Sequence, residues 1–261
     1  MTEKMLMRKD GAVGWMIFNN PERRNAVSAS MWQAIPGILD ALEADEAIRV
    51  IVLTGTGDKA FVAGADISEF EKNRNSADAA REYGIAADAA QLRMYRCTKP
   101  TIAMIRGYCI GGGLGVALNC DMRIAAKSAK FAVPAARLGL GYAAKHIKKL
   151  VDVVGTAQAK EIFYTARRYG AEEAYRIGLV NHLVEDGELE AKVAEICASI
   201  ADNAPLTIHA AKEAIFEINR VDALPDLDRC DQLEKACFDS EDYAEGRRAF
   251  MEKRKPVFRG R

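Results

Sequence analysis

Three consecutive glycines, Gly111, Gly112 and Gly113, stand between an apolar run over 101–105 and an apolar segment over 114–118. The run has the length and the Pro and Gly bounds of a buried strand, and the segment after the glycines is typical of a helix. Glycine lets a backbone approach a ligand closely, and the first N–H groups of a helix have no partner within it. The pattern therefore predicts a site for negative charge, with a tight strand-to-helix turn as the simpler alternative.

The composition of the chain argues against several classes of protein. The chain has 261 residues, and 37 lysines and arginines balance 37 aspartates and glutamates, so no basic excess indicates nucleic-acid binding. No apolar run reaches the ~18 residues of a membrane span, and the charged N-terminus does not resemble a secretory signal. The six cysteines lack a CxxC pair and the three histidines are far apart. We expect a soluble, cytoplasmic protein with reduced thiols and no metal.

Strand, helix and glycine-loop patterns alternate in the first half, which favours an α/β fold with largely parallel strands. A helix is expected over 28–43, capped by Ser28 or Ser30, with a kink at Pro36-Gly37. The expected strands cover 13–19, 50–53, 101–105, 122–126 and 130–133, with a short extended piece within 178–184. Helices are expected over 146–154, 156–166, 171–177, 187–202, 204–219 and 225–253.

Two segments, FVAGADISEF over 61–70 and YCIGGGLGVALNCD over 108–121, occur together in this order. With NPERRNAVS before them and AKFAVPAARLGLGY after them, they resemble the crotonase superfamily, also called the enoyl-CoA hydratase/isomerase family. The resemblance implies a ClpP/crotonase-like spiral of ββα units over 1–200 and a helical C-terminal region over 201–261. It also implies homotrimers or hexamers, and an acyl-CoA thioester as substrate with no further cofactor.

The resemblance implies an oxyanion hole made by the backbone N–H groups of Ala65 and Gly112. Preorganised donors of this kind stabilise the enolate that forms on a thioester oxygen, by about 3–4 kcal/mol each. The resemblance also assigns residues to coenzyme A and substrate binding: Arg24, Asn25, Ala26, Ala63, Asp66, Ile67, Ser68, Pro134 and Lys253. Lys253 is either such a contact, possible also on a neighbouring subunit, or a solvated helix lysine.

Two positions depart from the pattern of the family's hydratases, which carry two glutamates. Here the corresponding residues are Gly115 and Ala135, so both acid/base carboxylates are absent. Loss of CO2 from a malonyl-type CoA forms the enolate without a base, and this reaction is therefore favoured. The family's methylmalonyl-CoA decarboxylases carry a tyrosine shortly after a Leu-Gly pair, and Tyr142 stands there. Tyr142 is therefore a candidate catalytic residue, or an aromatic wall of the acyl pocket.

Two other classes stay open. The first is a hydratase or isomerase that uses a non-standard acid/base residue, with Glu69, Lys145 and His146 as candidates. The second is an acyl-CoA-binding homologue without turnover. An apolar acyl pocket is expected from Leu114, Leu138, Leu140 and Tyr142.

Overall fold

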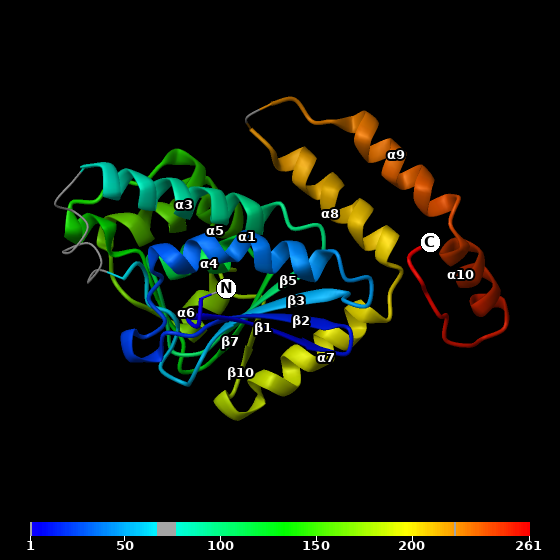
Figure 1. Cartoon of the computed structure of the whole chain (residues 1–261), viewed down its shortest axis with the longest axis horizontal. Coiled ribbons are helices and arrows are strands. Elements are labelled where there is room, and N and C mark those ends of the chain that lie inside the picture. The colour runs from blue at the N-terminus through cyan, green and yellow to red at the C-terminus, as the bar shows by residue number, and fades with distance from the viewer. Residues whose placement is uncertain (1, 67–76, 222) are drawn as a thin grey trace. The chain divides into compact units, whose positions relative to one another are not determined.

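The computed structural model describes residues 2–66, 77–221 and 223–261 (Figure 1). The chain divides into two compact units. The first consists of Met1–Cys97 and Thr101–Val193, and the second of Thr98–Pro100 and Ala194–Arg261. The expected division into a core over 1–200 and a helical region over 201–261 stays a prediction.

The larger sheet of the first unit has the strand order β1-β2-β3-β5-β7-β10. β1 and β2 are antiparallel, and all the following pairs are parallel. The strands are β1 (Met5–Asp10), β2 (Val13–Phe18), β3 (Val50–Gly55), β5 (Thr101–Ile105), β7 (Met122–Ala126) and β10 (His182–Val184). Sequence reasoning missed β1 because its polar residues hide the strand pattern. The buried strands β3 and β5 are the apolar runs that it identified.

A second sheet has the order β4-β6-β8-β9 and lies at the glycine turn. Its strands are short: β4 (Ala60–Val62), β6 (Tyr108–Ile110), β8 (Lys130–Ala132) and β9 (Tyr169–Gly170). β4, β6 and β8 are parallel, and β9 returns antiparallel to β8. β4 and β6 therefore bring the two motif segments, which are about 45 residues apart in the chain, next to each other.

Helices α1 (Ala29–Glu43) and α3 (Ala77–Tyr95) lie side by side over the larger sheet (Figure 1). The Ser28 side chain caps α1 by accepting a hydrogen bond from the Met31 N–H, as expected, and α1 continues through Pro36. The first unit also contains α4 (Gly112–Leu118), α5 (Ala144–Thr165), α6 (Ala171–Arg176) and the 3₁₀ helices η1 (Pro21–Arg23), η2 (Pro134–Leu138) and η3 (Asp186–Glu188). Gly155 interrupts α5 with a left-handed φ of 77°, at the position where two separate helices were expected.

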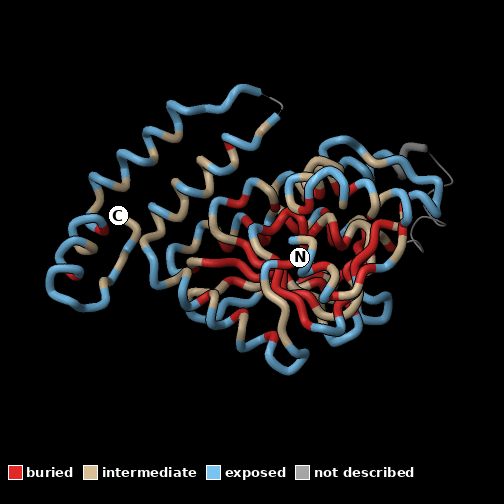
Figure 2. Tube along the Cα trace, turned by 180° about the vertical axis from the view of Figure 1, so that it is seen from behind, coloured by how far each residue is buried: buried red, intermediate tan, exposed pale blue. Residues whose placement is uncertain are grey.

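The buried residues of the first unit form one continuous core between the sheets and helices (Figure 2). Its members include Ile35 and Leu39 of α1 and Phe131 of β8. Burial of each large apolar side chain contributes about 1.5–3 kcal/mol. This packed core holds the loops that carry the candidate site.

α7 (Leu189–Ala201) is followed in the second unit by α8 (Pro205–Asn219), α9 (Leu227–Phe238) and α10 (Glu241–Met251). The single helix expected over 225–253 is wrong, because the chain breaks at Asp239 and Ser240 and starts again. The Ser240 hydroxyl accepts a hydrogen bond from the Tyr243 N–H at 3.0 Å, which caps α10. Within the described residues, no helix is long and apolar enough to cross a bilayer.

Candidate active site

The glycine turn between β6 and α4 brings the backbone of Gly112 close to β4. Gly111 has a left-handed φ of 55°, and its N–H donates to the Ala132 carbonyl at 2.8 Å. A Cβ atom at Gly113 would lie 1.9 Å from the Val62 carbonyl oxygen, so only glycine permits this approach of α4 to β4. Pro134 lies beside the same turn, with its Cδ 3.8 Å from the Cβ position of Gly111.

Ala65 follows β4 and pairs with Val27 in a single parallel bridge. The Val27 N–H donates to the Gly64 carbonyl at 2.8 Å, and the Asp66 N–H donates to the Val27 carbonyl at 3.1 Å. This pattern turns the Ala65 N–H away from Val27. The Ala65 nitrogen lies 3.7 Å from the Cβ position of Gly112.

The Ala65 nitrogen therefore lies close to the backbone of Gly112, and the oxyanion hole assigned to these two N–H groups stays a prediction. Neither N–H has an acceptor within residues 2–66, 77–221 and 223–261. Two adjacent backbone donors without acceptors form an arrangement that can receive an oxygen atom carrying negative charge.

The segment around Arg24 runs beside the segment that leads to Ala65. The Ala63 N–H donates to the Arg24 carbonyl at 3.1 Å. Asn25 is fully buried with a φ of 57°, and its amide donates to the carbonyls of Thr56 at 3.0 Å and Ala60 at 2.8 Å. These bonds hold Arg24, Ala26, Ala63 and Asp66 in one region, although they come from two distant parts of the chain.

Two guanidinium groups lie against the ring of Tyr108. Arg24 is 5.2 Å and Arg168 is 5.6 Å from the ring centroid, which is cation–π distance. Sequence reasoning missed Arg168, because it follows α5 and no motif identifies it. The two arginines concentrate positive charge at Tyr108, the first residue of β6, and the Arg24 carbonyl is bonded to Ala63.

A cavity of about 180 Å³ lies next to Gly112. It is lined by Gln91, Gly111, Gly112, Leu114, Gly115, Leu118, Val133, Gly141, Tyr142, Ala143, His146, Leu150 and Phe163. Leu114 and Tyr142 line it as expected. Leu138 and Leu140 are not among the lining residues and are 65% and 50% exposed, so their placement in the pocket wall is wrong. Leu138 ends η2 and Leu140 follows it by two residues, and both side chains are exposed before the chain enters α5.

A glutamine occupies the space beside Gly115. The Gln91 Oε1 atom lies 3.3 Å from the Cβ position of Gly115, and Asn119 donates to this oxygen at 3.4 Å. Asn119 in turn accepts from the Lys149 ammonium. Because an ammonium only donates hydrogen bonds, the Lys149 contact shows which end of the Asn119 amide is the oxygen. The NH2 group of Asn119 then donates to the Gln91 oxygen.

Lys149 lies behind this wall, against the ring of Tyr95 at 4.2 Å. Burial, with a further contribution from the charge of Lys145, lowers the pKa of Lys149 to about 8, while Asp88 opposes the shift. Gln91 and Lys149 were not expected at the site, since neither belongs to a motif.

Tyr142 packs edge-on against Phe163, with ring centroids 5.3 Å apart and planes at 75°. Burial raises the pKa of Tyr142, so its hydroxyl stays protonated near neutral pH and can act there only as a proton donor or a hydrogen-bond partner. Ala135, one of the two positions where the sequence predicts that a glutamate is missing, is buried in η2.

His146, on the first turn of α5, contacts Asp88 on α3. The imidazole Nε2 lies 3.0 Å from Asp88 Oδ1, and the Lys145 ammonium donates to Asp88 Oδ2 at 2.6 Å. Partial burial opposes ionisation, but the hydrogen bonds from Lys145 and His146 hold the pKa of Asp88 below its ordinary value. His146 was one of the candidates named from the sequence, whereas Asp88 was missed because it lies 58 residues away.

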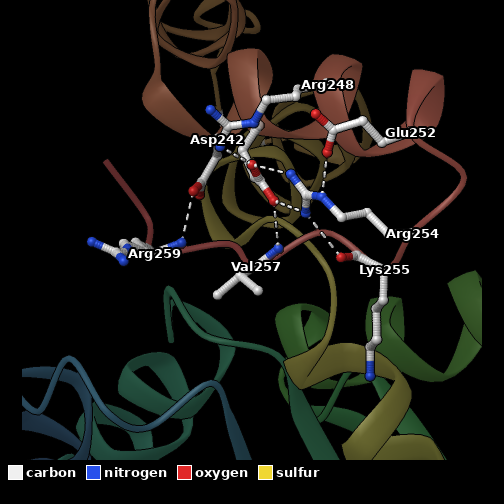
Figure 3. A network of polar contacts seen from close by, with 8 residues as sticks. Asp242, Arg248, Glu252, Arg254, Lys255, Val257 and Arg259 are labelled. Atoms are coloured by element: carbon white, nitrogen blue, oxygen red, sulfur yellow. Dashed lines mark hydrogen bonds and ion pairs between the residues drawn. The ribbon is translucent and has the colours of Figure 1, made fainter.

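Lys253 lies in the second unit, at the end of α10, with a left-handed φ of 54°. The tail beyond it folds back onto α10 (Figure 3). The Val257 N–H donates to Glu245 at 3.1 Å, and the Arg259 and Gly260 N–H groups donate to Asp242 at 2.7 Å each. Hydrogen bonds from Arg254 and Arg248, and then from the Val257 N–H, keep the pKa of Glu245 well below its ordinary value. Lys253 is exposed, and these hydrogen bonds hold the chain that follows it against α10.

Three residues named from the sequence, Ile67, Ser68 and Glu69, lie outside the described residues. Among the described residues, no group of three or more His, Cys, Asp or Glu side chains could hold a metal ion. The expectation that no metal or separate cofactor takes part stays a prediction.

Comparison with known proteins defines the class. Residues 8–261 match the family model described as enoyl-CoA hydratase/isomerase. The chain is 36% identical to the short-chain-enoyl-CoA hydratase of Clostridium acetobutylicum over 251 residues, which covers 96% of this chain and 95% of that protein. It is 36% identical to the crotonyl-CoA hydratase of Syntrophomonas wolfei over 260 residues, with 98% of each chain covered.

Among solved structures, an enoyl-CoA hydratase/carnithine racemase from Magnetospirillum magneticum superposes with a TM-score of 0.93 at 36% identity. The match covers 100% of this chain and 97% of that one. The chain belongs to the enoyl-CoA hydratase/isomerase family, and the predicted crotonase fold is confirmed.

Proposed function

We propose that this protein is an acyl-CoA enzyme that binds the thioester oxygen between the N–H groups of Ala65 and Gly112 and stabilises the enolate there. The observation that carries the proposal is the adjacency of these two donors, neither of which has an acceptor in the described part of the chain. Backbone donors of this kind require no particular side chain at Ala65.

The reaction that we favour is a lyase reaction that needs no base, such as decarboxylation of a malonyl-type CoA. The described lining of the cavity contains no aspartate or glutamate, which supports this choice. In that reaction the bond from the α-carbon to the carboxylate breaks, CO2 leaves, and the electron pair forms the enolate. The enolate then takes a proton at the α-carbon, and Tyr142 and His146 are the titratable groups of the described cavity wall that could supply it.

Hydration or isomerisation of an enoyl-CoA is the second candidate. Two relatives are named as hydratases, which favours this chemistry. It requires a group that both takes and gives a proton, and glycine and alanine at positions 115 and 135 supply none. The presence of an imidazole in the cavity wall is the observation that keeps this candidate.

Coenzyme A itself would lie along the Arg24–Ala63 region. Its phosphates carry negative charge, and the guanidinium groups of Arg24 and Arg168 provide complementary charge there. Ala26, Asp66 and Pro134 keep their expected role as contacts in this proposal, and Lys253 stays either a contact, possible also on a neighbouring subunit, or a solvated helix lysine. The thioester is the substrate, and no other cofactor is required.

We also propose a homotrimer, or a hexamer of two trimers, assembled through the second unit. That unit exposes large apolar side chains, among them Phe238, Phe250 and Met251, which are 56%, 82% and 80% exposed. A cavity of about 750 Å³ lies among α8, α9 and α10. Exposed apolar surface of this kind is typical of a subunit interface.

The test of the oxyanion hole uses one position with two substitutions. Gly112 is the first residue of α4, where proline is compatible with a helix, and Gly112→Pro replaces the N–H by a ring carbon. Gly112→Ala keeps the N–H, and its Cβ would meet no atom closer than 3.7 Å. We expect Gly112→Pro to lower kcat by about 10²–10³-fold, and Gly112→Ala to lower it much less.

Turnover is measured by mass spectrometry with crotonyl-CoA and methylmalonyl-CoA in parallel. A chromophoric unsaturated acyl-CoA reports thioester polarisation through a red shift of its absorbance, which Gly112→Pro should abolish. Equal turnover by the proline variant and the wild type would contradict the site. CO2 release from methylmalonyl-CoA supports the lyase reaction, and water addition to crotonyl-CoA supports the second candidate.

A further inference from the structure

A series of hydrogen-bonded polar side chains leads from α5 to the cavity beside Gly112. The Lys149 ammonium donates to the Oδ1 atom of Asn119, which follows α4 and is only 3% exposed. The Asn119 amide donates to the Gly115 carbonyl at 2.8 Å and to the Gln91 Oε1 atom at 3.4 Å. Gln91 lines the cavity, whereas Lys149 and Asn119 are not among the lining residues. The series therefore ends at the cavity wall.

These contacts decide which end of each amide is the oxygen. An ammonium only donates and a backbone carbonyl only accepts, so Asn119 presents its oxygen to Lys149 and its NH2 group to Gly115. The same NH2 group faces Gln91, so the Gln91 atom in this contact is the oxygen. The Nε2 group of Gln91, with its two hydrogens, is then the end of the amide that lies away from Asn119.

The Nε2 group of Gln91 is a donor without an acceptor in the described parts of the chain. It does not belong to the fully buried atoms that lack a partner, so it borders accessible space. The amide end of Gln91 lies against the cavity wall, with Oε1 3.3 Å and Cδ 4.0 Å from the Cβ position of Gly115, which lines the cavity as well. The geometry thus places an open N–H donor at the cavity.

The electrostatics of this donor favour a partner with negative charge. The two hydrogen bonds run in the same direction, from Lys149 to Asn119 and from Asn119 to Gln91, and aligned hydrogen bonds polarise one another. Asp88 opposes the charge of Lys149, but Asp88 also binds the Lys145 ammonium at 2.6 Å. The described lining of the cavity contains no aspartate or glutamate that would repel an anion. A hydrogen bond from Nε2 to an ionised oxygen is therefore favourable.

A purely structural role of these side chains would be to join α3, α4 and α5. Burial lowers the pKa of Lys149, which means that the fold loses stability by holding an ammonium there. An apolar side chain at this position would join the same helices without that loss. A structural role also leaves the open Nε2 group of Gln91 unexplained. A buried charge behind an open donor favours a role in binding.

We propose that Gln91 determines the specificity for the acyl group by donating from Nε2 to a carboxylate oxygen of the substrate, and that Asn119 and Lys149 orient and polarise this donor. The proposal rests on the proposed function, in which the thioester lies at Gly112. It narrows the substrate class to CoA thioesters of short dicarboxylic acids. Gln91 is thus a binding residue, and Asn119 and Lys149 are positioning residues.

The experiment compares four CoA esters whose acyl groups have nearly the same shape. Malonyl-CoA ends in a carboxylate, and isovaleryl-CoA has two methyl groups in its place. Acetoacetyl-CoA and 3-hydroxybutyryl-CoA carry a neutral carbonyl and a hydroxyl there. Each ester displaces the chromophoric unsaturated acyl-CoA from the full-length protein, and stopped-flow absorbance gives the dissociation constant before turnover. We expect the wild type to bind malonyl-CoA more tightly than the other three esters.

Gln91→Leu removes the donor and keeps a side chain of similar size. It should weaken malonyl-CoA binding by about 10–100-fold and change isovaleryl-CoA binding by less than about threefold. Gln91→Glu places a carboxylate at the same point, and its repulsion should weaken malonyl-CoA binding at least as much. Gln33→Leu is the matched control at an exposed position of α1, and it should leave all four dissociation constants unchanged.

Lys149→Met tests the positioning role. It should reduce the preference for malonyl-CoA over isovaleryl-CoA by about two- to tenfold at pH 7. In the wild type this preference should fall towards pH 9.5, because Lys149, with a pKa of about 8, loses its charge, and Lys149→Met should not show this fall. Asp88, Lys145 and Tyr95 also face Lys149, so the variant and the wild type are compared at each pH. Lys148→Met should behave as the wild type does.

The outcomes that would overturn the proposal are distinguishable from failure of the proposed function. An unchanged malonyl-CoA preference in Gln91→Leu removes the role of Gln91, and tighter binding of either neutral oxygen ester than of malonyl-CoA removes the carboxylate. Either result leaves the oxyanion hole intact if the chromophoric thioester keeps its red shift. A wild type that neither binds nor polarises an acyl-CoA removes the proposed function, and this inference with it. Should Gln91→Leu fail to fold, Gln91→Glu carries the test.

Discussion

The two sides of the cavity differ in the groups that form them, which are backbone groups on one side and side chains on the other. One side includes backbone: Gly111 and Gly112 line the cavity, and the close approach of α4 to β4 places the Ala65 nitrogen near Gly112. The other side consists of side chains from α3, from α5 and from the segment before α5: Gln91, His146 and Tyr142. A single substitution can delete a side-chain group, whereas a backbone donor is lost only through substitution by proline or through a movement of the chain. The family's variety of reactions is therefore expected on the side-chain half.

The strongest test of the backbone half is Gly113→Ala. The new Cβ would meet the Val62 carbonyl oxygen at 1.9 Å, and a backbone atom cannot rotate away. We expect the free energy of unfolding in urea to fall by about 3 kcal/mol or more.

Gly84→Ala is the matched control on α3, because a Cβ there meets no atom within 4 Å. It should stabilise the protein by up to about 1 kcal/mol. Equal stability of Gly113→Ala and the wild type would show that the backbone half is not built on this contact.

Lys149 tests the support of the side-chain half. Its pKa is lowered from 10.5 to about 8, so the unfolded chain binds one more proton than the folded chain between these pH values, and stability gains from this group as pH rises through that window. The shift corresponds to at most about 3 kcal/mol. We therefore expect the stability of Lys149→Met relative to the wild type to be highest at pH 7 and to decrease towards pH 10. Loss of the contacts of Lys149 with Asn119 and Tyr95 offsets part of this gain.

The measurement is urea unfolding of the wild type, Lys149→Met and Lys148→Met at pH 7 and pH 10. Lys148 lies next in the chain and pairs with Asp152, so its variant should show no comparable change of the stability difference with pH. If the difference in unfolding free energy between Lys149→Met and the wild type is the same at pH 7 and pH 10, the Lys149 ammonium is not desolvated in the folded protein.

The smallest effect is expected from Tyr142→Phe. The ring contact with Phe163 is kept, and only the hydroxyl is lost. We expect turnover of the acyl-CoA substrate to fall by less than tenfold, which is about 1.4 kcal/mol or less in the barrier. A loss of a hundredfold or more would assign the proton transfer to the Tyr142 hydroxyl.

Local patterns predicted the elements whose signals are contiguous in the chain. The runs of β3 and β5, the Ser28 cap and the break of α5 at Gly155 were all readable, because each depends on a few neighbouring residues. β1 and the split between α9 and α10 were missed. β1 is a strand because β2 pairs with it, and α10 begins where the Ser240 cap restarts the helix.

The sequence by itself determined the family and the glycine turn, since these follow from ordered motifs, and it predicts the two backbone donors and the absence of the two glutamates. Only the tertiary structure decided which side chains lie beside Gly115 and His146. Gln91 fills the space at Gly115, and Asp88 meets His146 from 58 residues away, because α3 and α5 form one wall of the same cavity. Side-chain chemistry at a site depends on distances in space, and spacing along the chain does not encode them.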